Sequence, residues 1–436
     1  MLNKLFQCKG WTVAEINIHD FCVDVKLVID QRCTFTCPHC GGKLVTHSLR
    51  EIKAQDLPMV GQPVALWVQT LQGCCAACGK FSTHRPALLH PTMGYTLRYM
   101  KEVSDIYLYM PSSVVADKMC TSVSSVQRID KDVLKRELPE PCLDHVEGML
   151  ADEKYFGKKG FATLVLNART GEPLHLAPGK DEAALDSFFE RLSDEQLDSI
   201  KCIGIDRGNA YRASALSNKP DIAICYDPFH LVSNMLDVVD KVRRQEMAIA
   251  KKEKDAEKQE YLAGTRYLLL NNPENLKEDG AQRLKQLMEV NQNLHTVYTL
   301  KEQFRAIFQD KEGDAPMWSL VEWIRMAAAS GIEAVVKFAK GIAARANDIW
   351  NAFRFKMNSG RIESANAALE RIVRKACGLF DFPYILLKLR QQFFIHQQQQ
   401  ERKNRHPLSG PNPPSKSESG PQIHPQNHAE EHRILF

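Results

Sequence analysis

The sequence lacks the long apolar segments and the strong excess of one charge that would point to a membrane or to a whole-molecule polyanion partner. No window of the 436 residues approaches 18 uninterrupted apolar residues, so no membrane span and no membrane partner are expected. The first ten residues are mixed in character, and no small-residue cleavage site follows them, which argues against a signal peptide. Lys plus Arg exceed Asp plus Glu by only 57 to 53, too little to prove a polyanionic partner. We therefore expect a cytoplasmic protein.

The sequence also lacks an internal repeat of fixed period and the context of a disulfide framework. Thirteen cysteines in a chain with no signal sequence indicate reduced thiols and a metal site. A chain of 436 residues can bury more than one hydrophobic core, so roughly two to four domains are expected.

Two short cysteine motifs mark the N-terminal part of the chain. Cys37 to Cys40 and Cys75 to Cys78 are separated by 34 residues, and each is a CxxC motif followed by glycine. A tetrahedral zinc ribbon has this pattern, because paired thiolates lie about 2.3 Å from zinc and glycine eases the turn behind each pair. Cys74 is an alternative to Cys75, but only Cys75 gives matching spacing. Four unconnected buried cysteines and a redox dithiol are the other interpretations, although one dithiol would suffice for redox chemistry. Residues 1–90 are therefore predicted to be a zinc-ribbon DNA-binding domain, with Zn²⁺ bound by Cys37, Cys40, Cys75 and Cys78.

The next segment, residues 91–145, has the pattern of a helix-turn-helix. A short helix beginning near Ser112, a turn near Cys120 and a second helix capped by Ser122 or Ser124 are expected. Any helical hairpin has similar spacing, so the preceding zinc ribbon supports much of the DNA-binding interpretation. The expected core residues are Val115, Met119, Val123, Val126 and Ile129. The side chains expected to project toward a DNA groove are Ser124, Ser125, Gln127 and Arg128.

Residues 146–227 alternate between strand and helix patterns. Three strands in a meander, a helix, a strand, a helix and a strand form the order of an RNase H-like core. In that fold the first strand and the end of the fourth strand lie side by side, so an acid on each can share metal ions. The strands are expected at Val146–Ala151, Phe161–Asn167, Pro173–Ala177, Ile200–Ile205 and Ile222–Tyr226.

Two aspartates occupy the strand ends where this chemistry would need them. Phosphodiester attack by water or a 3′ hydroxyl benefits from two divalent ions about 3.5–4 Å apart, and magnesium prefers carboxylate and water ligands. Asp152, after the first strand, and Asp206, after the fourth, are the predicted ligands. An Asp at a strand end is by itself more often a turn or cap residue, so the prediction rests on the pair. Glu153 would point to the opposite side of its strand. Asp227 and His230 follow the fifth strand and are expected to support the site from behind the metal ligands; a purely structural role for His230 is the alternative.

The remainder of the chain is predicted to be helical up to a polar tail. Residues 228–355 have helical apolar spacing and form an all-helical insertion, in which Trp318, Trp323 and Trp350 are expected to be core aromatics rather than base-stacking platforms. Residues 356–396 add two C-terminal helices of the catalytic core, the second with Arg390 facing out. Residues 397–436 are expected to be a disordered tail, since Glu401 to Phe436 contains six prolines and no periodicity.

A helix expected from about residue 360 to 377 carries the third candidate acid. Glu363, Asn366, Glu370 and Arg374 fall on one polar face. The simplest interpretation is a solvated face, with Glu370 pairing with Arg374 four residues on. Our hypothesis is that Glu363 completes a three-carboxylate metal site. From Arg361 to Arg405 nine Lys or Arg face four acidic residues, which would suit a phosphate backbone; a solvated basic face is the alternative.

Taken together, these residues resemble bacterial insertion-sequence transposases of the ISL-three family, over about residues 35–395. The resemblance implies a DDE transposase in which Asp152, Asp206 and Glu363 form the acidic triad and hold two magnesium (or manganese) ions. The residues that carry the resemblance are the two cysteine motifs, the helix-turn-helix pattern, Asp152 with Glu153, Ile205 and Asp206 with Tyr211, Asp227 to His230, Arg243 with Arg244, Asn358 to Asn366 and Arg374 to Gly378. The residues that would position DNA near the metal ions are Asn366, Arg374 and Lys375.

The activity implied by the resemblance is two-metal cleavage and strand transfer at the terminal inverted repeats of a mobile element. The implied partners are double-stranded DNA, as terminal repeats and as target, and a second copy of the chain, in a homodimer or larger assembly on DNA. The protein would then be associated with the bacterial nucleoid. Two other functions stay open: a DNA-binding regulator that has lost the chemistry, and an RNase H-like nuclease unrelated to a mobile element. Because 156 residues lie between Asp206 and Glu363, sequence spacing does not establish that Glu363 approaches the two aspartates.

Overall fold

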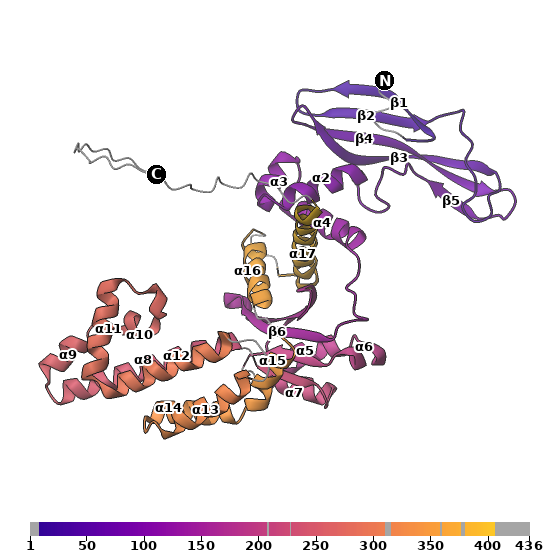
Figure 1. The fold of residues 1–436 in the computed structure, drawn as a ribbon. Helices are drawn as coiled ribbons and strands as arrows, with labels where there is room; N and C mark the ends of the chain where they lie inside the picture. The colour runs from indigo at the N-terminus through magenta and orange to yellow at the C-terminus, as the bar shows by residue number, and fades with distance from the viewer. Residues whose placement is uncertain are drawn as a thin grey trace, which may run out of the picture. The chain divides into compact units, whose positions relative to one another are not determined.

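The structure, a computed structural model, describes residues 8–206, 209–226, 228–309, 315–357, 360–375 and 380–405. These residues form two five-stranded sheets and a large number of helices (Figure 1). Among the described helices, none is long and apolar enough to cross a membrane.

The first sheet is formed by the N-terminal part of the chain and has the order β1-β2-β4-β3, with β5 paired to the C-terminal end of β4. Its centre is the long β3–β4 hairpin, whose turn at Val60 and Gly61 has φ angles of 51° and 79°, as a two-residue hairpin turn requires. Along β4 buried and half-buried residues alternate, so one face of the sheet forms a core with Val25, Leu66 and Val68. The strands are β1 Trp11–Ile18, β2 Val23–Ile29, β3 Leu44–Met59, β4 Gln62–Cys75 and β5 Phe81–His84.

Three helices follow this sheet: α2 Leu97–Tyr107, α3 Ser112–Lys118 and α4 Val123–Glu137. The last two lie where the helix-turn-helix was expected. The turn contains Cys120 with a φ of 52°, and the Ser122 side chain caps α4 by accepting from the Ser125 amide. The expected core residues are buried except Val123, which is 37% exposed. That prediction was wrong because Val123 occupies the first helical position, one turn before the buried stripe begins.

The second sheet has the order β10-β9-β6-β7-β8. Strands β6, β7 and β8 form an antiparallel meander, while β9 runs parallel to β6 and β10 runs parallel to β9. All five strands overlap the predicted segments, but β8 is one residue longer than predicted and β6 continues to Tyr155. Asp152 therefore lies inside the strand rather than at its end, because β7 still pairs with β6 beyond the end of β9 at Ile205. The strands are β6 Gly148–Tyr155, β7 Phe161–Asn167, β8 Pro173–Pro178, β9 Cys202–Ile205 and β10 Ala223–Tyr226.

Helices cover both faces of this sheet. One face packs Met149 and Ala151 against α5 Glu182–Phe189 and α7 Asn209–Asn218, with the short α6 Asp194–Ser199 following α5. The other face packs Leu150 against α16 Gly360–Lys375 and α17 Phe382–Arg405. Because successive strand residues alternate between faces, Asp152 shares the face of Leu150 and Glu153 lies on the opposite one, as expected.

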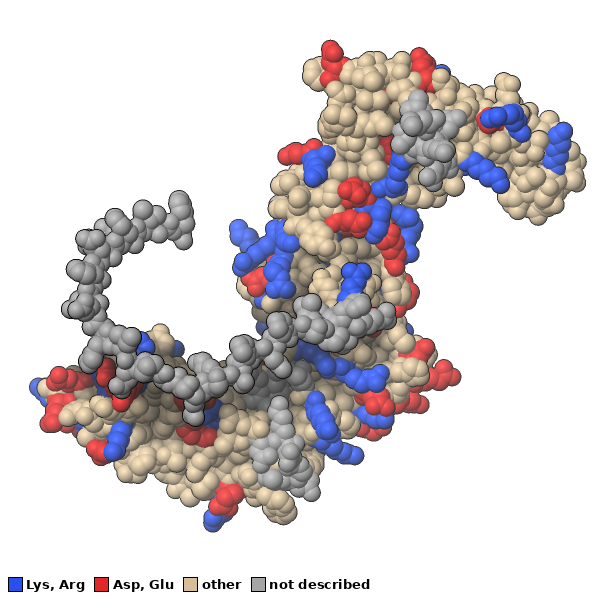
Figure 2. All heavy atoms as spheres, turned by 45° about the horizontal axis from the view of Figure 1, so that its top comes forward, with Lys and Arg blue, Asp and Glu red and all other residues tan. Residues whose placement is uncertain are grey.

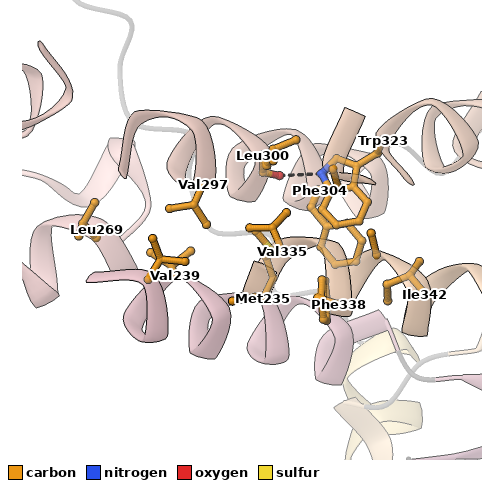
Figure 3. Close-up of a cluster of buried hydrophobic side chains, with 14 of the residues drawn as sticks. Met235, Val239, Leu269, Val297, Leu300, Phe304, Trp323, Val335, Phe338 and Ile342 are labelled. Atoms are coloured by element: carbon orange, nitrogen blue, oxygen red, sulfur yellow. Dashed lines mark hydrogen bonds between the residues drawn. The ribbon is translucent and has the colours of Figure 1, made fainter. Parts of the chain in front are cut away.

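Between β10 and α16 the described residues form helices and turns only. Figure 3 shows the interior of this segment, where Phe304 and Phe338 pack around Trp323, whose indole N–H donates to the Leu300 carbonyl at 2.8 Å. Trp350 is half-buried. Trp318 is 74% exposed, so its assignment to the core was wrong; the apolar spacing around it continues a helix whose buried face is already filled by Leu320 and Trp323.

The helices of this segment are α8 Pro228–Lys252, α9 Ala256–Leu262, α10 Arg266–Leu270, η2 Pro273–Asn275, α11 Glu278–Val290, α12 Gln292–Gln309, α13 Ala315–Ala329, α14 Glu333–Ala343 and α15 Ala346–Arg354. Outside this segment, the short turn η1 Gly157–Lys159 joins β6 to β7.

The C-terminal helices correct two expectations. Helix α17 reaches Arg405, so residues 397–405 are helical rather than disordered, in keeping with the good helix propensity of its glutamines. The rest of the predicted tail lies outside the described residues. Arg390 is only 3% exposed, although it was expected to face out. Its guanidinium donates to the Pro139 carbonyl at 2.6 Å and to the Glu172 carboxylate at 3.1 Å, which compensates for its burial.

Candidate metal centres and active site

The two cysteine motifs form matching knuckles at the end of the β3–β4 hairpin. In the first, the Gly41 amide donates to the Cys37 carbonyl at 2.9 Å and the Cys37 amide donates to the Gly42 carbonyl at 2.7 Å. Gly79 and Cys75 repeat the first of these bonds at 2.9 Å. Gly41 and Gly79 have φ angles of 73° and 69°, a left-handed conformation that favours glycine. Main-chain geometry therefore aims both pairs of thiols inward.

The four predicted sulfur ligands converge on one point. Their Sγ atoms all lie within 4.8 Å of one another, with 3.7 Å between Cys37 and Cys78 and 3.4 Å between Cys40 and Cys75. A tetrahedral zinc site with Zn–S bonds of about 2.3 Å has sulfur–sulfur edges of about 3.8 Å. Backbone amides, that of Cys78 above all, lower the pKa of the Cys75 thiol, which favours the thiolate that a metal requires. The pKa of the neighbouring Cys40 thiol is raised, because hydrogen bonds with the Cys75 and Cys78 thiols together outweigh the Gly42 amide, which lowers it. The residue types and spacing fit Zn²⁺. Cys74 lies outside the group, with its sulfur 3.6 Å from the Gly79 carbonyl oxygen.

The register of the second sheet brings Asp152 and Asp206 together. Ala151 pairs with Ile205 in the parallel β6–β9 ladder, so the next residue on each strand lies at the same edge of the sheet. Both aspartates line a cavity of about 20 Å³, enough for about one water-sized group. Gly204 permits this close packing, because a Cβ there would lie only 2.7 Å from the Leu150 side chain.

Asp152 is held by two hydrogen bonds in a largely buried position. The Asn366 side-chain amide donates to Oδ2 at 2.7 Å, and the Glu153 main-chain amide donates to Oδ1 at 2.8 Å. Burial raises the pKa of Asp152 to about 6, and the charges of Glu153 and Asp206 add to this effect, while the Glu153 amide and His230 oppose it. A cation beside Asp152 would favour its charged form.

Asn366 itself supplies a second feature of the site. It was predicted to contact DNA, but it is only 9% exposed and lies against Asp152. Its side-chain oxygen Oδ1 is buried and accepts no hydrogen bond from any residue that the structure describes. Two carboxylates with a nearby unsatisfied amide oxygen form the hard oxygen donor set that Mg²⁺ and Mn²⁺ prefer, so these residues fit such an ion.

The other predicted members of the site lie at different distances from it. His230 lines the same cavity, with Nδ1 3.9 Å from the Asp206 Oδ2 atom. Asp227 lies outside the described residues. Glu363 is exposed in the first turn of α16, next to Ile362, which is buried and lines the cavity. Within the part of the chain that the structure describes, the three carboxylates do not form a group whose oxygens all lie within 4.8 Å. The fold thus brings the two aspartates together and leaves Glu363 at the rim.

The candidate DNA-contacting residues of the helix-turn-helix lie in the first turns of α4. Ser125 is half-buried and its hydroxyl accepts from the Tyr95 hydroxyl at 3.2 Å, so this residue helps to hold the turn together. The other three have exposed or half-buried side chains: Ser124, Gln127 and Arg128.

Farther along α16, Arg374 pairs with Glu370, as the i,i+4 spacing predicts. Lys375 donates to the Leu108 carbonyl at 3.5 Å. Glu370 also binds the Lys154 ammonium at 3.3 Å, and Lys154 is a residue that the sequence reasoning missed. Strand alternation was the available signal, because Lys154 lies two positions beyond the first aspartate and so shares its face of β6.

Known proteins resemble this chain over much of its length. The family model of ISL-three-type DDE transposases, described as "Transposase", matches residues 149–389. The transposase for insertion sequence element IS1001 of Bordetella parapertussis is 28% identical over 362 residues, which cover 82% of this chain and 88% of that protein. The transposase for insertion sequence element IS1557 of Mycobacterium tuberculosis is 30% identical over 248 residues, or 52% of this chain and 55% of that protein. The family match spans more than half of the chain and contains both aspartates, the helical segment and α16. The chain therefore belongs to the ISL-three family of DDE transposases, whose members cut and join DNA.

Proposed function

We propose that this protein binds the terminal inverted repeats of an insertion sequence and carries out two-metal cleavage and strand transfer of DNA. The observation that carries the proposal is the side-by-side position of Asp152 and Asp206 on neighbouring parallel strands. The strand order β10-β9-β6-β7-β8, with only β7 antiparallel to both of its neighbours, supports an RNase H-like core around them.

Each residue of the site has a distinct part in this proposal. Asp152 and Asp206 would hold magnesium or manganese, which when bound activates the attacking hydroxyl and stabilises the leaving oxygen. Asn366 orients Asp152 by donating to it, and His230 lies beside Asp206. Glu363 would supply the third carboxylate from the first turn of α16. Like charges resist close approach, and a cation between the three carboxylates would offset that repulsion.

DNA recognition is assigned to the N-terminal part of the chain. Zn²⁺ bound by the four cysteines would stabilise the end of the β3–β4 hairpin, and the exposed start of α4 would enter a groove of the terminal repeat. Because transposition pairs two ends of an element, we propose that a dimer or a larger assembly forms on DNA.

The test is strand cleavage of a labelled duplex that carries the ends of the element, with magnesium, with manganese and with EDTA. We expect cleavage with either metal and none with EDTA. Binding with no cleavage in both metals would instead identify a DNA-binding regulator. Cleavage that does not depend on the end sequence would identify a general nuclease.

A further inference from the structure

Three arginines meet at one carboxylate in the helical segment that follows β10. Asp240 of α8 pairs with Arg243 at 2.8 Å and with Arg244 at 3.1 Å on the same helix. It also pairs with Arg266, the first residue of α10, at 3.7 Å. Within the described part of the chain, these arginines pair with no other carboxylate. We call the four residues the arginine cluster, and no step proposed so far uses it.

The arginine cluster has a local excess of positive charge. Its three guanidinium groups and one carboxylate leave two positive charges in excess. Elsewhere in the helical segment, Arg325 pairs with the one carboxylate of Glu322, and Arg305 pairs with two, those of Glu274 and Glu302. On the face drawn in Figure 2, Lys and Arg are interspersed with Asp and Glu, so no broad basic surface marks a path for an anion there. A local excess such as this one therefore carries more information than the overall charge.

Two of the three arginines are open to solvent. The side chains of Arg244 and Arg266 are 67% and 56% exposed, whereas those of Asp240 and Arg243 are mostly buried. Exposed ion pairs of this type contribute only about 0–1 kcal/mol, so Arg244 and Arg266 can turn toward a second anion at little cost. A phosphate fits best, because its oxygens match the planar fork of a guanidinium group.

The geometry of α8 relates the arginine cluster to the two aspartates. His230 lines the same cavity as Asp152 and Asp206, and it lies near the start of α8. Arg244 follows His230 by 14 residues on this continuous helix. That spacing is just under four turns and about 21 Å, so both side chains leave α8 on the same side. The exposed residues on this side between them carry no net charge: Ser233, Asp237 and Lys241.

This spacing corresponds to a fixed length of DNA. Successive phosphates of one strand advance about 3.4 Å along a duplex, so 21 Å is about six base pairs. A duplex that lies along α8, with the phosphodiester to be cut beside the aspartates, would therefore bring another backbone phosphate to Arg244.

We propose that the arginine cluster binds a backbone phosphate of double-stranded DNA, about six base pairs from the bond that is cut. Arg244 and Arg266 bind the phosphate, while Asp240 keeps the two guanidinium groups together. The contact positions the duplex on the helical segment and reads no base. The proposal rests on the proposed transposase function and adds a DNA-binding site to it.

The test measures binding of a fluorescent duplex that carries an end of the element to the full chain, in EDTA, over a range of salt concentrations. Arg244→Gln and Arg266→Gln should each lower the salt dependence by about one ion. Each should weaken binding about fivefold at about 0.15 M salt. Arg244→Lys should keep the salt dependence, because it keeps the charge. A role limited to holding α8 and α10 together predicts an unchanged salt dependence in all three variants.

Arg325→Gln is the matched control. Arg325 is also exposed in the helical segment, but its charge is balanced by Glu322. This variant should bind DNA like wild type, and thermal unfolding checks that every variant folds. An equal loss of binding in Arg325→Gln and Arg244→Gln would show a general effect of charge and overturn the site.

Neutral methylphosphonate linkages, placed one at a time in the duplex, locate the contact. The linkage about six base pairs from the end of the element should weaken wild-type binding about fivefold, because it removes the charge of the phosphate that the cluster binds. The same linkage should weaken binding by Arg244→Gln no further. If every linkage that weakens wild-type binding weakens Arg244→Gln equally, the site is overturned.

The outcomes distinguish this proposal from the proposed function. An unchanged salt dependence in both Arg244→Gln and Arg266→Gln overturns the phosphate site even if the wild-type protein cleaves DNA. A loss of about one ion in each variant, in a protein that cleaves nothing with magnesium or manganese, supports the phosphate site and overturns the catalytic proposal.

Discussion

The four cysteines and the three carboxylates differ in how far the fold alone assembles them. All four sulfurs lie within 4.8 Å of one another, whereas among the described residues the carboxylates of Asp152, Asp206 and Glu363 form no such group. The cysteines are placed by main-chain turns on one hairpin, with a left-handed glycine behind each pair. The acids come from two strands and a helix, and they carry like charges. In the cysteine site the main chain places the ligands, while in the acidic site the like charges of converging carboxylates oppose their approach and a cation would offset that repulsion.

The largest expected effect is the loss of the cysteine site. Cys40→Ser should lower bound zinc from about one ion per chain to less than half, because structural zinc contributes about 10–16 kcal/mol of apparent binding free energy. Elemental analysis and unfolding of the N-terminal sheet measure the result. Cys74→Ser is the matched control: Cys74 is next to a ligand but outside the group, so zinc content should be unchanged. Equal zinc loss in both variants would show that the motif was assigned to the wrong cysteine.

The next largest expected effect is the loss of the Asp206 carboxylate, which the sheet places beside Asp152. Asp206→Asn should reduce metal-dependent cleavage at least about 1,000-fold, since charge stabilisation by the metal ions amounts to several kcal/mol. Binding of end DNA should persist, as measured by mobility shift. Asp198→Asn changes an aspartate that is 85% exposed on the side chain and serves as the control. Cleavage at the wild-type rate by Asp206→Asn would exclude this residue from the chemistry.

The same comparison explains which parts of the site could be predicted from the sequence. The neighbouring positions of Asp152 and Asp206 could be predicted, because strand periodicity and strand order determine which residues meet across a parallel ladder. The position of Glu363 relative to the two aspartates could not be predicted. It depends on how α16 packs on the sheet rather than on any spacing in the chain. Burial of Arg390 was missed for a related reason: its partners, the Pro139 carbonyl and Glu172, come from distant segments.

A smaller effect tests how the buried Asp152 carboxylate changes the stability of the fold. Because the pKa of Asp152 is raised from 3.8 to about 6, the folded chain holds this proton more tightly than the unfolded chain does. The stabilisation of the folded state by this proton is present below about pH 4 and is lost as the pH rises through about 6. Asp152→Asn should therefore raise the free energy of unfolding in EDTA by on the order of 2 kcal/mol above pH 7, and by little at pH 4. Urea unfolding at the two pH values measures this; an equal change at both would mean that titration of Asp152 is not the cause.

The smallest effect concerns Glu363, the acid that the fold leaves at the rim. Because its side chain is exposed, Glu363→Gln should change the free energy of unfolding in EDTA by less than about 0.5 kcal/mol. If magnesium draws this carboxylate inward, the variant should bind the ion about tenfold more weakly, which is about 1.4 kcal/mol less stabilisation by saturating magnesium. Glu370→Gln, on the same helix but paired with Lys154 and Arg374, should keep the full stabilisation by magnesium. An identical magnesium response in wild type and Glu363→Gln would mean that the two aspartates bind the ion without the helix, and that the acidic site, like the cysteine site, draws its ligands from a single sheet.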